Sequence, residues 1–125
     1  MKILVLDDDT NLLDSLKNML EQYEHEVHCS SSAQDAVGVA QKHIFDVMLV
    51  DYKMPENDGI WFMKNAKIPK KTKVLLITAY TNKEIISKMF SVGASGYLIK
   101  PFGESDLLRH INFLTEQGDQ RPLGL

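Results

Sequence analysis

Apolar residues follow two alternating patterns along the chain. In the first pattern, short runs of mostly apolar residues stand together, which is typical of strands that are covered on both faces. These runs are residues 3–6, 27–29, 47–50, 73–78 and 96–99. In the second pattern, apolar residues recur every three or four positions, which predicts amphipathic helices. These stretches are residues 12–23, 33–40, 60–66, 85–90 and 107–114. Ser31 or Ser32 suits the N-cap of the second helix, and Gly93 suits the C-terminal end of the fourth.

Five strands that alternate with five helices predict an α/β fold with one doubly wound parallel sheet and helices on both faces. Such a sheet commonly has the strand order 2-1-3-4-5, the flavodoxin-like (βα)5 arrangement. Its ligand crevice lies at the carboxyl ends of strands one and three. We expect this domain over residues 1–117, with residues 118–125 as a C-terminal tail or the start of a linker.

Composition and charge restrict the partners that we expect. The chain has 14 Lys and Arg against 17 Asp and Glu, a formal net charge of −3, which argues against a nucleic-acid or anionic membrane surface. The single cysteine, Cys29, cannot form an internal disulfide, which suits a reducing compartment. No apolar run approaches the ~20 residues of a membrane helix, and the early Asp7 does not fit a secretory signal. We therefore expect a soluble, cytoplasmic protein that binds neither nucleic acid nor membrane.

Carboxylates follow two strands that are neighbours in the expected order. Asp7, Asp8 and Asp9 end the first strand, and Asp51 ends the third. Close like charges oppose one another's ionisation unless a cation lies among them, and ligand sets made only of oxygen select Mg²⁺, Mn²⁺ or Ca²⁺ over zinc. We interpret Asp7, Asp8 and Asp51 as a cation site, and Asp9 as the cap of the following helix. The histidines are scattered without ligand spacing, and we assign no metal role to any of them: His25, His28, His43 and His110.

A hydroxyl and an ammonium follow two further strands. Thr78 ends the fourth strand, and Lys100 follows the fifth, directly before Pro101. Next to a bound cation, a lysine and a hydroxyl donor neutralise and orient a phosphoryl group, as phosphoryl transfer requires. The expected sheet edge thus carries the residue types of a phosphoryl-binding site.

Four segments of the chain resemble the receiver domain of bacterial two-component response regulators. They are ILVLDDD at 3–9, VMLVDYKMPENDG at 47–59, LLITA at 75–79 and GYLIKPF at 96–102. They stand in the family's order at expected strand ends, and the resemblance covers about residues 2–117. It implies a phosphorylation-activated switch of a two-component phosphorelay, which catalyses only its own Mg²⁺-dependent phosphorylation and autodephosphorylation.

The resemblance also implies the metal site and the phosphoacceptor. Asp51 would attack the phosphohistidine of a sensor histidine kinase or a phosphotransfer protein. Asp8 would bind Mg²⁺ directly and Asp7 through water, while Asp51 and the backbone carbonyl of Lys53 complete the protein ligands. Because a carboxyl group is ordinarily ionised at pH 7, Asp51 needs no general base.

The remaining implied roles concern binding of the phosphoryl group and transmission of the signal. Lys100 and Thr78 would bind phosphoryl oxygens, and the Lys100–Pro101 peptide would be cis. Tyr97 would be the aromatic switch that moves with Thr78. The fourth helix, fifth strand and fifth helix would then form the responsive face, through which we expect phosphorylation to strengthen either self-association, as a homodimer, or the docking of a partner.

A phosphatase of the haloacid-dehalogenase type is the main alternative, because it also combines an aspartyl nucleophile with Thr, Lys and Mg²⁺. Its motif requires an acid two residues after the nucleophile, and Lys53 occupies that position after Asp51. With Asp7 as nucleophile, Asp9 has the required spacing, but Asn11 stands where Thr or Val is expected. There is also no room for a substrate cap domain.

Two further alternatives share the expected fold. A flavodoxin-like electron carrier would need a first loop rich in Ser, Thr and Gly to bind FMN phosphate, whereas this loop consists of three aspartates. A degenerate receiver that serves only as an interaction module would lack some of the phosphorylation residues. The presence of Asp8, Asp51, Thr78 and Lys100 argues against that reading.

Overall fold

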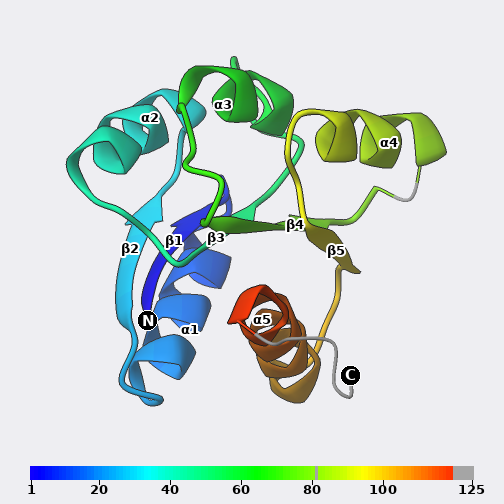
Figure 1. The fold of residues 1–125 in the computed structure, drawn as a ribbon. Coiled ribbons are helices and arrows are strands. Elements are labelled where there is room, and N and C mark those ends of the chain that lie inside the picture. The colour runs from blue at the N-terminus through cyan, green and yellow to red at the C-terminus, as the bar shows by residue number, and fades with distance from the viewer. Residues whose placement is uncertain (81, 120–125) are drawn as a thin grey trace.

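The structure of the chain, a computed structural model, describes residues 1–80 and 82–119. Strands and helices alternate in the expected order (Figure 1). They are β1 (Lys2–Leu6), α1 (Thr10–Glu21), β2 (Glu26–Ser30), α2 (Ala33–Lys42), β3 (Val47–Val50), α3 (Gly59–Asn65), β4 (Lys73–Thr78), α4 (Lys83–Ser91), β5 (Gly96–Ile99) and α5 (Glu104–Asp119). Within the described residues, no helix is long and apolar enough to cross a membrane.

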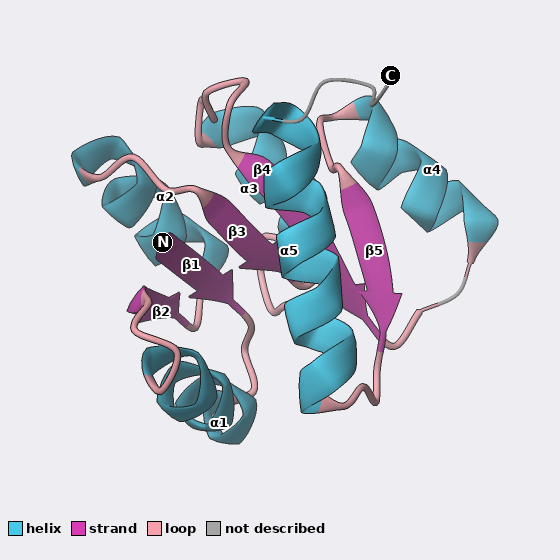
Figure 2. Ribbon diagram, turned by 60° about the horizontal axis from the view of Figure 1, so that its bottom comes forward, coloured by secondary structure: helices cyan, strands magenta, loops and turns pink. Residues whose placement is uncertain are grey.

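The five strands form one parallel sheet in the order β2-β1-β3-β4-β5. Helices α2, α3 and α4 cover one face, and α1 and α5 cover the other (Figures 1 and 2). The prediction of a doubly wound flavodoxin-like fold is therefore confirmed. Because all strands run in the same direction, their carboxyl ends share one edge of the sheet.

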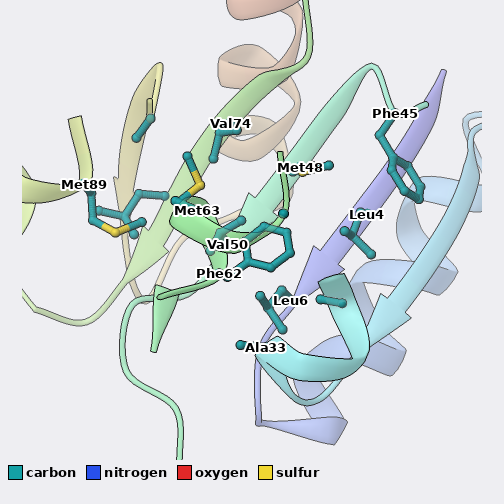
Figure 3. Packing of buried hydrophobic residues seen from close by; sticks show 14 of the residues in the cluster. Leu4, Leu6, Ala33, Phe45, Met48, Val50, Phe62, Met63, Val74 and Met89 are labelled. Carbon is teal, nitrogen blue, oxygen red and sulfur yellow. The ribbon is translucent and has the colours of Figure 1, made fainter. Parts of the chain in front are cut away.

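Alternate residues of β1, β3 and β4 supply two separate hydrophobic cores. In β1, Leu4 and Leu6 enter the core under α2, α3 and α4, whereas Ile3 and Val5 enter the core under α1 and α5. The continuous apolar runs of the sequence thus reflect strands that are buried on both sides. Figure 3 shows the first of these cores. Phe62 of α3 belongs to it and is fully buried. Truncation of such a side chain to alanine costs about 3–5 kcal/mol of stability.

Polar caps fix several helix boundaries. Asp9 caps α1 as expected, since its Oδ1 accepts hydrogen bonds from the backbone N–H groups of Asn11 and Leu12 at 3.0 and 3.1 Å. Of the two serines that suit the second helix, Ser32 is the N-cap of α2. Gly93 follows the C-cap of α4 with φ +118°, a conformation that glycine adopts without strain.

The helix bounds differ from the apolar periodicity by a few residues, and the first and last helices differ most. The first begins at Thr10 and ends at Glu21, so the exposed Tyr23 lies beyond it. The last begins at Glu104 and continues to Asp119, because polar residues extend a helix beyond its apolar stripe. It therefore passes the domain limit expected at residue 117, and residues 120–125 of the expected tail lie outside the described residues.

Candidate functional site

Three charged side chains from three strand ends meet at the carboxyl edge of the sheet. Asp7 follows β1, Asp51 follows β3, and Lys100 follows β5. The Lys100 Nζ donates hydrogen bonds to Asp7 Oδ2 at 2.6 Å and to Asp51 Oδ2 at 3.2 Å. The strand order brings these residues together although Asp7 and Lys100 are 93 positions apart in the sequence.

The acidic side chains form one cluster with unequal exposure. One carboxylate oxygen from each of Asp7, Asp8 and Asp51 lies within 4.8 Å of the others. Asp7 is fully buried and Asp51 nearly so, whereas Asp8 is exposed to solvent. The second oxygen of Asp7 accepts the backbone N–H of Asp9 at 2.9 Å. Asp7 is thus fixed on both oxygens, while Asp8 is accessible to an ion from solution.

Burial and like charge perturb the ionisation of this cluster. Burial, reinforced by the nearby Asp7, raises the pKa of Asp51 to about 6, against the opposing effect of Lys100. Burial lowers the pKa of Lys100, but its hydrogen bond to Asp7 and the charge of Asp51 outweigh that effect and raise the pKa overall. A single ammonium thus incompletely compensates the carboxylates. A divalent cation held only by oxygen would offset the remaining charge, so the residues present fit Mg²⁺.

An open pocket of about 400 Å³ lies over this cluster. Its lining residues are Asp8, Asp51, Lys53, Met54, Pro55, Ala79, Tyr80 and Lys100. Thr78 is fully buried beneath this edge, and its Oγ1 accepts the backbone N–H of Tyr80 at 3.0 Å. The Lys100–Pro101 peptide bond is cis.

The loop after β3 holds Asp51 through backbone packing. Asp58 caps α3, with its Oδ1 accepting the N–H of Trp61 at 2.9 Å. The N–H of Gly59 donates to the carbonyl of Tyr52 at 2.7 Å, and a Cβ at Gly59 would lie only 2.5 Å from the carbonyl oxygen of Asp51. Only the structure shows that Gly59, which has no Cβ, allows the close approach of α3 to the Asp51 backbone.

One aromatic side chain, that of Tyr80, lines the pocket. The Tyr80 ring centre lies 5.4 Å from Lys53 Nζ and 6.1 Å from the Tyr52 ring, which meets it edge to face. Lys53 and Tyr80 both line the pocket. These side chains therefore limit the open surface through which solvent reaches Asp51.

The expected switch residue lies away from the pocket. Tyr97 is 44% exposed, and its ring packs edge to face against Phe90 at 6.2 Å. Phe113 of α5 is also exposed. The outer face of α4, β5 and α5 thus presents apolar rings, and Arg109 is paired within α5 to Asp106 at 2.8 Å.

The structure overturns one interpretation of the histidines. We read them as scattered, but the rings of His28 and His43 lie 4.5 Å apart between centroids, so this reading is wrong for the pair. Glu26, which we did not single out, joins them. Glu26 and His28 could have been linked by their i, i+2 spacing on one strand. The position of His43 depends on the packing of α2 and has no signal in the sequence.

Some α/β domains bind their ligands at the carboxyl edge of a doubly wound sheet, at the point where the strand order reverses. The fold and the acidic pocket with its lysine place this protein in that class. A comparison of the sequence with known protein families leads to the same class. The chain belongs to the response regulator receiver domain family, whose model matches residues 3–112. Members are regulatory signalling domains of two-component systems, and receiver domains in general bind Mg²⁺ at the acidic pocket.

Individual relatives support the same assignment. The chain is 29% identical over 116 residues to the transcriptional regulatory protein SrrA of Staphylococcus aureus, a match that covers 93% of this chain and 48% of SrrA. The chain thus spans about half the length of the curated relatives it matches. The haloacid-dehalogenase alternative has no support among these comparisons.

Solved structures of similar fold are receiver proteins too. The Vibrio cholerae chemotaxis protein CheY4 has a TM-score of 0.84 at 30% identity, covering 90% of this chain and 97% of that one. A CheY-like receiver domain protein from Methanospirillum hungatei has a TM-score of 0.88 at 32% identity, covering 94% and 96%. The receiver domain of DrrB, described as activated by BeF3, has a TM-score of 0.81 at 29% identity, covering 92% and 97%.

Proposed function

We propose that this chain is a signalling switch in which Asp51 accepts a phosphoryl group with the help of Mg²⁺. The observation that carries this proposal is the position of the Asp51 carboxylate, which lines an open pocket between the acidic cluster and the Lys100 ammonium. With a pKa of about 6, Asp51 is mainly ionised at pH 7, as a nucleophile must be. A bound cation would shift the group further toward the ionised form.

Unequal burial of the acids supports separate roles at the metal. Asp8 lines the pocket and is exposed, so it is suited to bind Mg²⁺ directly. Asp7 is buried and already holds Lys100 and a backbone N–H, so it is suited to act through water. Asp51 and the backbone carbonyl of Lys53 complete the proposed ligands. When bound, Mg²⁺ supplies positive charge to the phosphoryl oxygens.

The transfer forms one bond and breaks one bond. An Asp51 oxygen attacks phosphorus while the bond from phosphorus to the donor imidazole nitrogen breaks, and that nitrogen retains the electron pair. Lys100 then exchanges its 3.2 Å contact with Asp51 for one with a phosphoryl oxygen. The Thr78 hydroxyl donates to another phosphoryl oxygen, which draws Thr78 toward the pocket.

The proposed partners follow from this chemistry. The phosphoryl donor is a sensor histidine kinase or a phosphotransfer protein. The readout is a shift of α4, β5 and α5, in which the exposed Tyr97 ring turns inward into space vacated by Thr78. Self-association through this face is one consequence, and the chain catalyses only its own Mg²⁺-dependent phosphorylation and autodephosphorylation.

Acetyl phosphate as a small donor tests the assignment. Intact-mass measurement of the purified chain should show one phosphoryl addition with Mg²⁺ and none with a chelator. The addition should be absent in Asp51→Asn and present in Asp35→Asn, a control at an exposed acid of α2. A modification that persists in Asp51→Asn would contradict the proposal.

A further inference from the structure

A second group of metal-ligating side chains lies on the edge strand β2, apart from the acidic pocket. Glu26 and His28 are two residues apart on β2 and therefore point to the same face of the sheet. His43 is the C-cap of α2, the helix that packs over this edge. One ligand atom from each of the three residues lies within 4.8 Å of the others.

The polar contacts within this group already favour a cation. His28 Nε2 lies 2.7 Å from Glu26 Oε2. The Lys2 ammonium lies 3.5 Å from the same carboxylate oxygen and 3.2 Å from His43 Nδ1, which accepts its proton as a hydrogen bond. A positive charge thus lies between the carboxylate and an imidazole lone pair, where a metal ion would make the same contacts.

A buried aromatic ring supports both imidazoles. Phe45 is almost fully buried, and its ring meets His28 edge to face at 5.4 Å between centroids. The same ring lies 5.8 Å from His43 at a tilted angle. Because Phe45 belongs to the core, it restricts the rotation of the two histidines and keeps them together. Neither histidine is fully covered, so an ion can reach them from solvent.

We propose that Glu26, His28 and His43 form a binding site for a divalent transition-metal ion of the Zn²⁺ type. Two imidazole nitrogens and one carboxylate oxygen are ligands that Zn²⁺ prefers, whereas Mg²⁺ prefers oxygen alone. Metal–ligand bonds of 2.0–2.1 Å in a tetrahedron separate the ligand atoms by about 3.3 Å, so the present arrangement closes by rotation of side chains. Lys2 leaves the site when the ion enters, and water completes the coordination.

This site is independent of phosphorylation at Asp51. Glu26 begins β2 opposite Lys2, at the amino end of the sheet, whereas the acidic pocket lies at the carboxyl end. A bound ion would join the edge strand to the end of α2. It would therefore stabilise the folded chain, and the added stability would rise with the logarithm of the ion concentration once that concentration exceeds the Kd.

Titration with Zn²⁺ alone tests the proposal. The full chain is titrated in a large excess of Mg²⁺, which occupies the acidic pocket, with a chromophoric chelator as competitor. One Zn²⁺ should bind per chain, and either His28→Gln or His43→Gln should weaken binding by more than about tenfold. Lys2→Met should strengthen binding, because no ammonium has to be displaced.

Two other histidines provide matched controls. His25→Gln and His110→Gln should leave the Zn²⁺ affinity unchanged. His25 is the stricter control, because its Nδ1 and the N-terminal amine are two nitrogen atoms only 3.0 Å apart and so the pair most able to compete for the ion. In the unaltered chain, Zn²⁺ should shift the ring-nitrogen resonances of His28 and His43 alone, a result that does not depend on how the variants fold. No binding, or binding that persists when both His28 and His43 are replaced, would overturn the proposal.

Discussion

The Lys100 ammonium donates its shorter hydrogen bond, 2.6 Å, to the fully buried Asp7 carboxylate. Its bond to Asp51 is longer, at 3.2 Å. Lys100 can therefore remain anchored by Asp7 while its contact with Asp51 passes to an incoming phosphoryl oxygen. The buried Asp7 thus has a positioning role in the proposed function, besides its contribution to the metal site.

Replacement of Asp51 should change the pH dependence of stability. The pKa of Asp51 is raised to about 6 in the folded chain, above the ordinary value of about 4 in the unfolded chain. Folding thus favours the protonated form of Asp51. The contribution of this protonated group to the free energy of unfolding is fully present below about pH 4, and it is lost as the pH rises through about 6. Without metal, Asp51→Asn should stabilise the chain at about pH 7.5 by about 1–3 kcal/mol.

Urea unfolding at about pH 4 and 7.5 measures this effect as the difference between the variant and the unaltered chain. Asp35→Asn, at an exposed acid, controls for a general change of net charge. Equal stabilisation by Asp51→Asn at both pH values would contradict the raised pKa.

The three neighbouring acids after β1 should differ in their effect on Mg²⁺ affinity. Asp8→Asn should weaken binding most, by more than about tenfold, because a directly bound ligand is lost. Asp7→Asn should have a smaller effect and Asp9→Asn the least, since Asp9 caps α1. Titration with Mg²⁺, followed by the fluorescence of Trp61, ranks the affinities of the variants. If Trp61 fluorescence does not change on binding, isothermal titration calorimetry measures the same affinities. Equal losses in all three variants would refute the order.

Tyr80 should protect the proposed aspartyl phosphate from water. Its ring lines the pocket and contacts both Tyr52 and Lys53, so Tyr80→Ala would open the pocket to solvent. We expect hydrolysis to become about 2–10 times faster, as measured by the decay of the phosphorylated mass. Tyr80→Phe keeps the ring and should retain the original lifetime. An unchanged or longer lifetime in Tyr80→Ala would count against shielding.

Gly59 should be essential for the position of Asp51. A Cβ at this residue would lie 2.5 Å from the Asp51 carbonyl oxygen, so Gly59→Ala must displace backbone. We expect a loss of about 1–3 kcal/mol of stability and slower phosphorylation by acetyl phosphate. Gly38→Ala is the control, because nothing lies within 4 Å of its added Cβ in α2, and it should stabilise the chain by about 1 kcal/mol. Normal stability and phosphorylation of Gly59→Ala would contradict this role.

Phosphorylation should strengthen association through the face of α4, β5 and α5. Exposed Phe90, Tyr97 and Phe113 give this face apolar area, and a coupling of about 1–3 kcal/mol is ordinary for a two-state switch. Asp106 and Arg109 are paired with each other within α5, so this pair has to open before either residue can bind a charged group of a second chain.

Sedimentation and amide exchange with beryllofluoride, a phosphoryl mimic, test this face. Added protection should appear within residues 83–109, and Tyr97→Ala should reduce it. Protection confined to α1 and α2 would show that another face carries the signal.

The sequence by itself determined the fold class and the residue types at the pocket. Apolar periodicity depends on which faces of each element are buried, so it predicted the strands, the helices and their alternation. Strand ends are visible in the sequence, and the order 2-1-3-4-5 follows from the common form of such sheets, so Asp7, Asp51 and Lys100 were expected at one edge. The Asp9 cap was predictable because it depends on backbone groups only two and three residues away.

Only the tertiary structure decided the distances and environments on which the chemistry depends. Burial of Asp51 beside Asp7 sets its raised pKa, and the contact of Gly59 with the Asp51 carbonyl depends on how α3 packs. His28 and His43 come together because α2 ends above the edge strand. These relations join residues from separate elements, and periodicity along the chain specifies the buried face of each element but not which residues of two elements meet.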